Sequence, residues 1–246
     1  EMCIRDSYIT YWCVLAKIRI MYLLCKQIRQ YMSSVIIING SPRKDGNTAK
    51  MCRAFAEGVK SQLQDATVET VNLYDFDFKG CRSCFACKLK GSKSYGHCSV
   101  KDPIMPVLEK AAQADILVLG SPIFLMDVSA QMKAFLERLI FPFATYEAGY
   151  KTIAPKRCDV ATIYTMNVPE EMFPEAVIAN IESFIGHVFN QPNRICAFNT
   201  YQFSDYSKYA VEVFDEESKR KYRDDMFPVE LESAFSLGMK MAKNIG

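Results

Sequence analysis

Short apolar runs alternate with helix-like patterns along the chain after residue 31. The run 35–38 has no polar alternation and ends at Asn39-Gly40, which is typical of a strand buried on both faces of a parallel sheet. Strands are predicted at 35–38, 67–73, 115–119, 160–165 and 194–198, and helices at 48–64, 104–113, 129–139, 170–189 and 228–244. This alternation predicts an α/β fold in which a doubly wound, five-stranded parallel sheet forms a single domain over residues 32–246. The loops at the carboxyl ends of the strands are then expected to carry the function.

The first 31 residues do not fit this pattern. Their longest apolar stretch contains Lys17 and Arg19, and each charge would cost a membrane span roughly 2.5–3.5 kcal/mol at its centre. Residues 1–7 resemble the translated end of a sequencing adapter. We therefore predict that residues 1–31 are a non-native leader, an adapter scar followed by upstream read-through, and that Met32 is the natural start. An amphipathic N-terminal helix or a membrane anchor are the alternatives.

Composition excludes several classes of function. Half of the residues are hydrophobic, which is enough for a buried core, and the net charge is only +2. The leader holds five of the basic and two of the acidic residues, so the remainder carries a net charge of −1. We expect neither a nucleic-acid nor a membrane partner, because both select strongly basic surfaces. Two histidines leave little room for a His-built metal site or a hydrolytic triad.

The loop 40–48 carries the first candidate chemistry. Two glycines allow a tight backbone, and Ser41, Asn47 and Thr48 supply donors beside the free N–H groups of a helix start. These features predict an anion site, most simply for a phosphate, to which Arg43 would add charge-assisted bonds. The spacing matches neither the P-loop nor the Gly-x-Gly-x-x-Gly dinucleotide fingerprint. An ordinary polar turn with a helix cap is the alternative.

Two segments carry a resemblance to a known family. Residues 38–48 resemble the FMN phosphate loop of the flavodoxin-like NAD(P)H-dependent FMN reductases, and residues 120–138 resemble their flavin-ring loop and the helix after it. The resemblance covers most of residues 34–190. It implies a flavodoxin-like fold, FMN as cofactor and NAD(P)H as co-substrate. The cofactor-binding residues that it implies are Ser41, Arg43, Gly46, Asn47, Thr48, Ser121, Pro122, Ile123 and Phe124, with Thr165, Met166 and Asn167 matching by position alone.

A cysteine cluster is the second candidate site. Its members follow the second predicted strand with spacings of two, two and ten residues: Cys81, Cys84, Cys87 and Cys98. Closely spaced thiolates are the usual ligands of iron–sulfur clusters, and this opening resembles the iron–sulfur flavoproteins of the same superfamily, which implies a [4Fe–4S] cluster. Structural zinc, and free or redox-active thiols, are the alternatives. We expect Gly91 and Gly96 to let the chain fold back across the longest gap.

Three further cysteines, Cys52, Cys158 and Cys196, are isolated and are predicted to be small buried hydrophobes. No disulfide network is implied, so a reducing, cytoplasmic location is predicted.

Together these features predict an FMN-dependent oxidoreductase that takes hydride from NAD(P)H. Electrons would pass to a small acceptor or through the cysteine-bound cluster, and the partner is a small-molecule or protein electron acceptor. The cofactor performs the chemistry, so no catalytic residue is assigned. The alternative is an electron carrier without small-molecule turnover, although carriers of the flavodoxin type are strongly acidic. The family resemblance also implies a homodimer or homotetramer.

Overall fold

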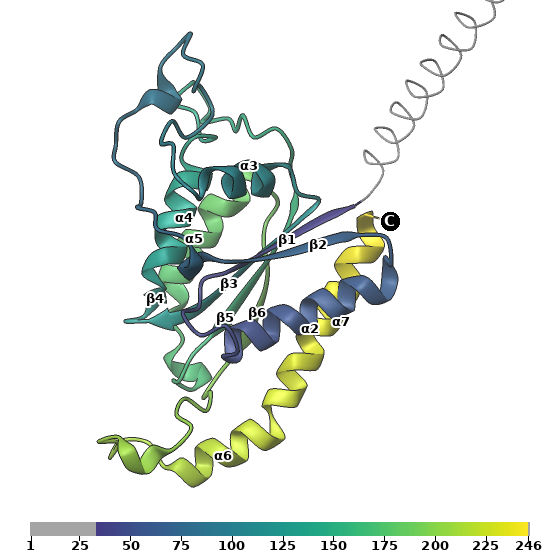
Figure 1. Ribbon diagram of the computed structural model, residues 1–246, viewed down its shortest axis with the longest axis vertical. Coiled ribbons are helices and arrows are strands. Elements are labelled where there is room, and N and C mark those ends of the chain that lie inside the picture. The colour runs from purple at the N-terminus through teal and green to yellow at the C-terminus, as the bar shows by residue number, and fades with distance from the viewer. Residues whose placement is uncertain (1–32, 246) are drawn as a thin grey trace, which may run out of the picture. The chain divides into compact units, whose positions relative to one another are not determined.

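The computed structural model describes residues 33–245, and the predicted leader lies outside them. Its centre is a sheet of five parallel strands in the order β2-β1-β3-β5-β6 (Figure 1). The doubly wound flavodoxin-like fold is thus confirmed. The strands are β1 Ser34–Asn39, β2 Thr67–Asn72, β3 Ile116–Phe124, β5 Asp159–Thr165 and β6 Asn193–Ala197, and the two-residue strand β4 Asp127–Val128 is antiparallel to β3.

Strand β3 is longer than predicted. The sequence Gly120-Ser121-Pro122 was expected to end the strand, but Ser121 and Pro122 continue to pair with β5. The strand then turns at Leu125 and Met126, which both have a positive φ, into β4. Pairing within the sheet therefore overrides the turn-forming residues.

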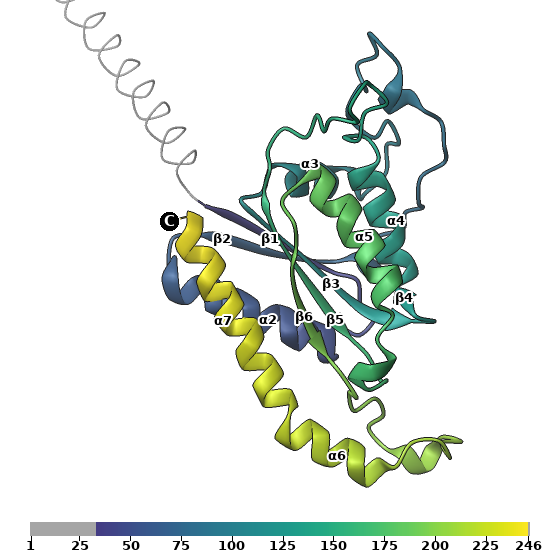
Figure 2. The ribbon, with the colours of Figure 1, turned by 180° about the vertical axis from the view of Figure 1, so that it is seen from behind.

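Helices cover both faces of the sheet (Figures 1 and 2). One face packs against α3 Met105–Gln113, α4 Ala130–Ile140 and α5 Glu175–Val188, and the other against α2 Asn47–Gln62 and α7 Phe227–Ile245. Alternate side chains of β1 enter the two cores, because successive residues of a strand point to opposite faces. This explains why the β1 sequence is apolar without interruption. No helix within residues 33–245 is both long and apolar enough to cross a membrane.

The contact between α2 and α7 depends on two glycines. A Cβ at Gly58 would lie 2.0 Å from the carbonyl oxygen of Phe235, and one at Gly238 would lie 2.2 Å from that of Phe55. Any larger side chain would push the helices apart. The two backbones therefore touch directly.

Two helix predictions differ from the structure. The helix expected over 170–189 is split, because Pro174 precedes a new start at Glu175 after a short 3₁₀ turn. The helix α6 Glu216–Asp225 was missed, although Asp215 caps it by accepting a hydrogen bond from the Ser218 N–H at 2.9 Å. The short 3₁₀ turns are η1 Leu73–Asp75, η2 Ala86–Lys88, η3 Glu170–Met172 and η4 Tyr206–Lys208.

Candidate active site

A pocket lies at the carboxyl ends of the parallel strands, as the fold predicts. Loops that follow β1, β5 and β6 contribute to it, together with the last residues of β3. It is lined by Ser41, Pro42, Arg43, Gly46, Asn47, Thr48, Pro122, Ile123, Phe124, Thr165, Met166, Asn167, Thr200 and Gln202. The structure therefore brings together all of the predicted cofactor-binding residues except Ser121.

Polar side chains in the loop after β1 accept hydrogen bonds from the backbone of the same loop. The Ser41 N–H donates to Asn39 Oδ1 at 3.1 Å, and Ser41 Oγ accepts from the Arg43 N–H at 3.2 Å. Helix α2 then begins at Asn47 without a side-chain cap and without an acidic residue in its first turn. The first N–H groups of a helix have no partner within the helix, so this end of α2 is suited to an anion.

Hydrogen bonds tie this first loop to two others. Thr48 Oγ1 and Thr165 Oγ1 are buried and lie 2.8 Å apart, which joins the loops after β1 and β5. Arg43 Nη1 donates to the Gln202 carbonyl at 2.7 Å, and Asn47 Nδ2 donates to the Tyr201 carbonyl at 3.1 Å. These hydrogen bonds therefore hold the loops that line the pocket to one another.

Ser121 has a different place. It is fully buried, and its hydroxyl accepts from the Ser129 N–H at 2.9 Å while donating to the Pro122 carbonyl at 2.8 Å. Ser129 caps α4 and donates to the Gly40 carbonyl at 2.7 Å. Ser121 therefore positions the start of α4 beside the first loop and does not line the pocket.

The loop after β6 was missed by the sequence analysis. Thr200 accompanies Met166 in the pocket, where its backbone N–H and its hydroxyl both donate to the Met166 carbonyl. Ligand sites in this fold lie at the carboxyl ends of the parallel strands, so the loop after the last predicted strand was a place to look for this residue.

Lys219 of α6 also reaches this region, where its ammonium donates to Asn167 Oδ1 at 2.7 Å. Burial lowers the pKa of Lys219 to about 8. Its helix has the composition of a charged surface segment, so no sequence pattern pointed to this contact.

The cysteine loop, residues 79–102, lies at the other end of α4. Ser129 at the start of α4 bonds to the pocket loops, whereas Glu137 and Arg138 in its last turn bond to the cysteine loop. The eleven residues of α4 rise about 16 Å. Figures 1 and 2 both show the loop after η1 running away from β4. The chain leaves the carboxyl end of β2, as expected, but after η1 it carries the cysteines to the far end of α4.

All four clustered cysteines line one small pocket together with Glu137, Arg138 and Phe141. The chain folds back as predicted: Gly91 and Gly96 have φ values of 74° and 76°, and the Gly96 N–H donates to the Cys87 carbonyl at 3.0 Å. Within residues 33–245, no three Cys, His, Asp or Glu side chains converge closely enough to hold a single metal ion.

Lys88 anchors the tip of the cysteine loop. Its ammonium donates to the carbonyls of Phe141, Pro142 and Ala144, which follow the last turn of α4, and lies 4.6 Å from the centre of the Phe141 ring. Burial lowers the pKa of Lys88. Carbonyls at a helix end lack partners within the helix, and a cation is favoured there.

The thiols differ in their surroundings. Cys84 is exposed, and hydrogen bonds from the Ala86 backbone and from Ser99 lower its pKa. Burial raises the pKa of Cys87. Of the three isolated cysteines, Cys52 and Cys158 are buried as predicted and Cys196 is half-buried; burial raises the pKa of each to about 12. Within residues 33–245 the exposed cysteines are Cys81 and Cys84, both in the cysteine loop, whereas Cys87 is buried and Cys98 half-buried.

Comparisons with known proteins bear on both sites. The model of one protein family, described as NADPH-dependent FMN reductase, matches residues 33–156. An iron–sulfur flavoprotein of Archaeoglobus fulgidus is 39% identical over 104 residues, which are 42% of this chain and 47% of that protein. One of Methanocaldococcus jannaschii is 34% identical over 104 residues, 42% of this chain and 50% of that protein. The chain spans about half the length of the curated relatives that it matches.

Solved structures resemble the fold. An NAD(P)H:quinone oxidoreductase from Methanothermobacter marburgensis superimposes with a TM-score of 0.60 at 15% identity, covering 85% of this chain and 97% of the other. An FMN-dependent NADH-azoreductase from Bacillus anthracis, in complex with FMN, gives a TM-score of 0.57 at 13% identity, covering 86% and 99%. At these identities the likeness concerns the fold alone.

Proposed function

The chain belongs to the NADPH-dependent FMN reductase family, and from this premise we propose that it binds FMN in the pocket at the carboxyl ends of its strands and reduces an acceptor with NAD(P)H. The observation that carries the proposal is the convergence of three loops, far apart in sequence, on an uncapped helix start. Such a helix start takes an anion, and the apolar residues beside it suit a flat ring.

The residues present fit FMN in their chemistry. Ser41 and Thr48, with the first N–H groups of α2, would hold the phosphate, and Arg43 at the pocket rim would add a positive charge. The ring would lie along Pro122, Ile123 and Phe124 on one side and along residues 165–167 on the other. Bound FMN accepts hydride from a nicotinamide and gives up electrons singly or in pairs. The protein's part is to anchor, orient and exclude water, which requires no acid or base from a side chain.

For the cysteine loop we propose an iron–sulfur cluster. Four thiols line one pocket, the guanidinium of Arg138 bonds to Cys98 Sγ, and the charge of Lys88 acts on the neighbouring Cys87. Thiolates and nearby positive charge favour such a cluster, which is several atoms wide and does not need the tight convergence of a single-ion site. Structural zinc is less well supported, because the side chains do not converge on one ion within residues 33–245.

Anaerobic purification followed by an absorption spectrum and analysis for FMN, iron, sulfide and zinc tests both proposals. We expect FMN together with iron and acid-labile sulfide. FMN without iron would contradict the cluster proposal, and the absence of both FMN and iron would contradict both proposals.

Thr48→Val should weaken FMN binding, because it deletes a pocket hydroxyl that also bonds to Thr165. Thr162→Val is the matched control, since that threonine of β5 bonds to Glu182 and does not line the pocket.

Turnover distinguishes a reductase from a carrier. The FMN-loaded protein should oxidise NADH or NADPH in the steady state with a quinone, a flavin or a nitroaromatic compound as acceptor. Failure with every acceptor, despite bound FMN, would support the electron-carrier alternative. The predicted homodimer or homotetramer stays a prediction, which light scattering of the loaded protein can check.

A further inference from the structure

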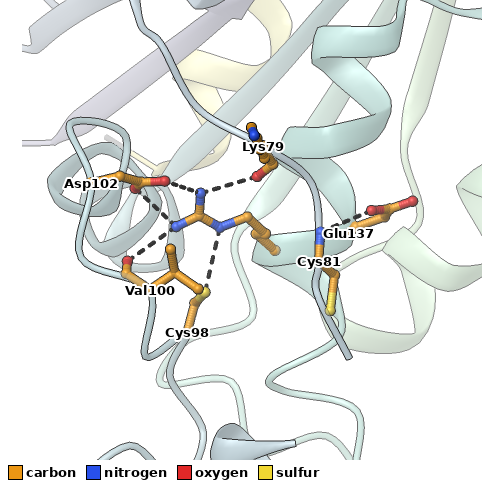
Figure 3. A network of polar contacts seen from close by, with 7 residues as sticks. Lys79, Cys81, Cys98, Val100, Asp102 and Glu137 are labelled. Carbon is orange, nitrogen blue, oxygen red and sulfur yellow. Dashed lines mark hydrogen bonds and ion pairs between the residues drawn. The ribbon is translucent and has the colours of Figure 1, made fainter. Parts of the chain in front are cut away.

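The side chain of Arg138 hydrogen-bonds to residues of the cysteine loop, and it is drawn unlabelled at the centre of the dashed lines in Figure 3. Its side chain is only 1% exposed, and each of its five N–H donors has an acceptor. Two donors form a bidentate pair with Asp102, at 2.5 and 2.9 Å. The others go to the carbonyls of Lys79 and Val100, both at 3.2 Å, and to Cys98 Sγ at 3.4 Å.

These partners come from both ends of the cysteine loop. Lys79 lies just before the first cysteine, whereas Cys98, Val100 and Asp102 lie at and after the last. The neighbouring Glu137 accepts from the Cys81 N–H at 3.0 Å. One turn of α4 therefore joins the two ends of the loop, as Figure 3 shows.

We propose that Arg138 is a positioning residue of the cysteine site, which closes residues 79–102 on α4 and holds Cys98 beside the other three thiols. The proposal rests on the proposed function of this loop as a cluster site. A side chain with this fork of donors is needed, because the ammonium of lysine cannot bond to both ends of the loop in a fixed plane.

A second arginine, Arg194, also forms a bidentate ion pair, but its hydrogen bonds have a different set of acceptors. Arg194 on β6 forms a similar bidentate contact with Glu182 and a further bond to Glu175, and all of these hydrogen bonds go to carboxylates. Arg138 instead divides its donors between a carboxylate, two carbonyls and a sulfur. Arg194 therefore provides a matched control for stability.

The charge of Arg138 adds a second consequence. A positive charge and an N–H···S bond next to a cluster ligand stabilise the more negative, reduced state, so the cluster potential rises. Removing Arg138 should therefore make the reduction potential of the cluster more negative. A residue that only stabilises the fold would leave this potential unchanged.

The first experiment uses the full chain after anaerobic reconstitution with iron and sulfide. Arg138→Met should shorten the survival of bound iron under a chelator roughly tenfold or more, since outer-shell partners of metal ligands have effects of this size. The potential should move to a more negative value, and Arg138→Lys should lie between Met and wild type. Arg194→Met should match the wild type in iron retention and potential. Equal behaviour of Arg138→Met and Arg194→Met would overturn the proposal.

The second experiment uses the metal-free, reduced full chain and does not depend on a cluster. Arg138→Met should accelerate hydrogen exchange over residues 79–102 and alkylation of Cys98 by iodoacetamide, with exposed Cys84 as internal reference. If the wild type binds no iron, the cluster proposal fails, yet these two rates still decide whether Arg138 holds the loop. Unchanged rates would refute that role. If the Met variant does not fold, Arg138→Lys and Asp102→Asn carry the same measurements.

Discussion

The two ends of α4 hold their neighbours in different ways. At its start, Ser129 joins a pocket whose walls are the ends of paired strands, so the sheet itself sets the position of each loop. At its end, the loop 79–102 lies away from the strand ends, where Arg138 and Glu137 of α4 bond to it and its own Lys88 bonds to carbonyls after α4. We therefore expect the pocket, which is built on strand ends, to tolerate the loss of one side chain better than the cysteine loop, which three side chains hold in place.

The largest effect is expected at the cysteine end. Asp102→Ala leaves the buried Arg138 charge without its counter-ion, which should lower the free energy of unfolding by about 3–5 kcal/mol. Asp127→Ala removes the half-exposed partner of Lys133 near the start of α4 and should cost no more than about 1 kcal/mol. Urea denaturation of both variants measures the difference. Equal losses would show that the two ends are held alike.

The next effect lies beneath the pocket. A Cβ at Gly120 would lie 2.5 Å from Cys52 Sγ and 3.3 Å from Thr48 Cγ2, so Gly120→Ala should cost about 1–3 kcal/mol and weaken FMN binding through Thr48. Both losses are measurable, by urea denaturation and by fluorescence titration with FMN. Adding Cys52→Ala should recover most of the stability by removing the sulfur. Strict additivity of the two substitutions would contradict this account.

A smaller effect is expected from the cap of α4. Ser129→Ala removes the acceptor for the Met132 N–H and the donor to the Gly40 carbonyl, at a cost of about 1–2 kcal/mol. Ser233→Ala on α7 is the control, because that exposed hydroxyl only bonds to a carbonyl of its own helix. Thermal unfolding of the two variants should rank them in this order, and hydrogen exchange at the cysteine loop should not change in either.

An effect of a different kind is a dependence of stability on pH at the pocket end. Burial lowers the pKa of Lys219 to about 8, below its ordinary value of 10.5. Between these values the unfolded chain binds more protons than the folded chain, so the free energy of unfolding rises with pH across this window. Lys219→Met should flatten that part of the profile, measured by urea denaturation at pH 7.5 to 10. An unchanged slope would mean that another group causes it.

The difference between the two ends also explains what the sequence could predict. Apolar runs and the loops after them follow from strand periodicity, so Thr48, Phe124 and Asn167 were placed correctly at one edge of the sheet. The cysteines were recognised by their spacing, but their position at the far end of α4 depends on Arg138, which is 36 residues beyond Asp102. A contact between side chains so far apart leaves no periodic trace in the sequence.

Local signals were also overridden or overlooked. Gly120-Ser121-Pro122 has the composition of a turn, yet pairing with β5 keeps it extended. Thr200 lines the pocket and Lys219 bonds to Asn167 of the pocket, and no motif in the sequence around either residue marks this contact. Predictions for the leader, residues 1–31, lie outside the described residues and stay predictions.

The bonds of Arg138 set an order of assembly. Lys79 and Asp102 are bonded by a residue that the ribosome adds 59 and 36 residues later, so the cysteine loop cannot close while the chain ends before α4. Closing such a loop early would cost chain entropy with nothing to hold it shut. If Arg138 holds the loop closed, a cofactor that needs all four thiols together would be inserted after α4 has docked on the sheet. Maturation of the cysteine site would then follow folding of the domain and would not guide it.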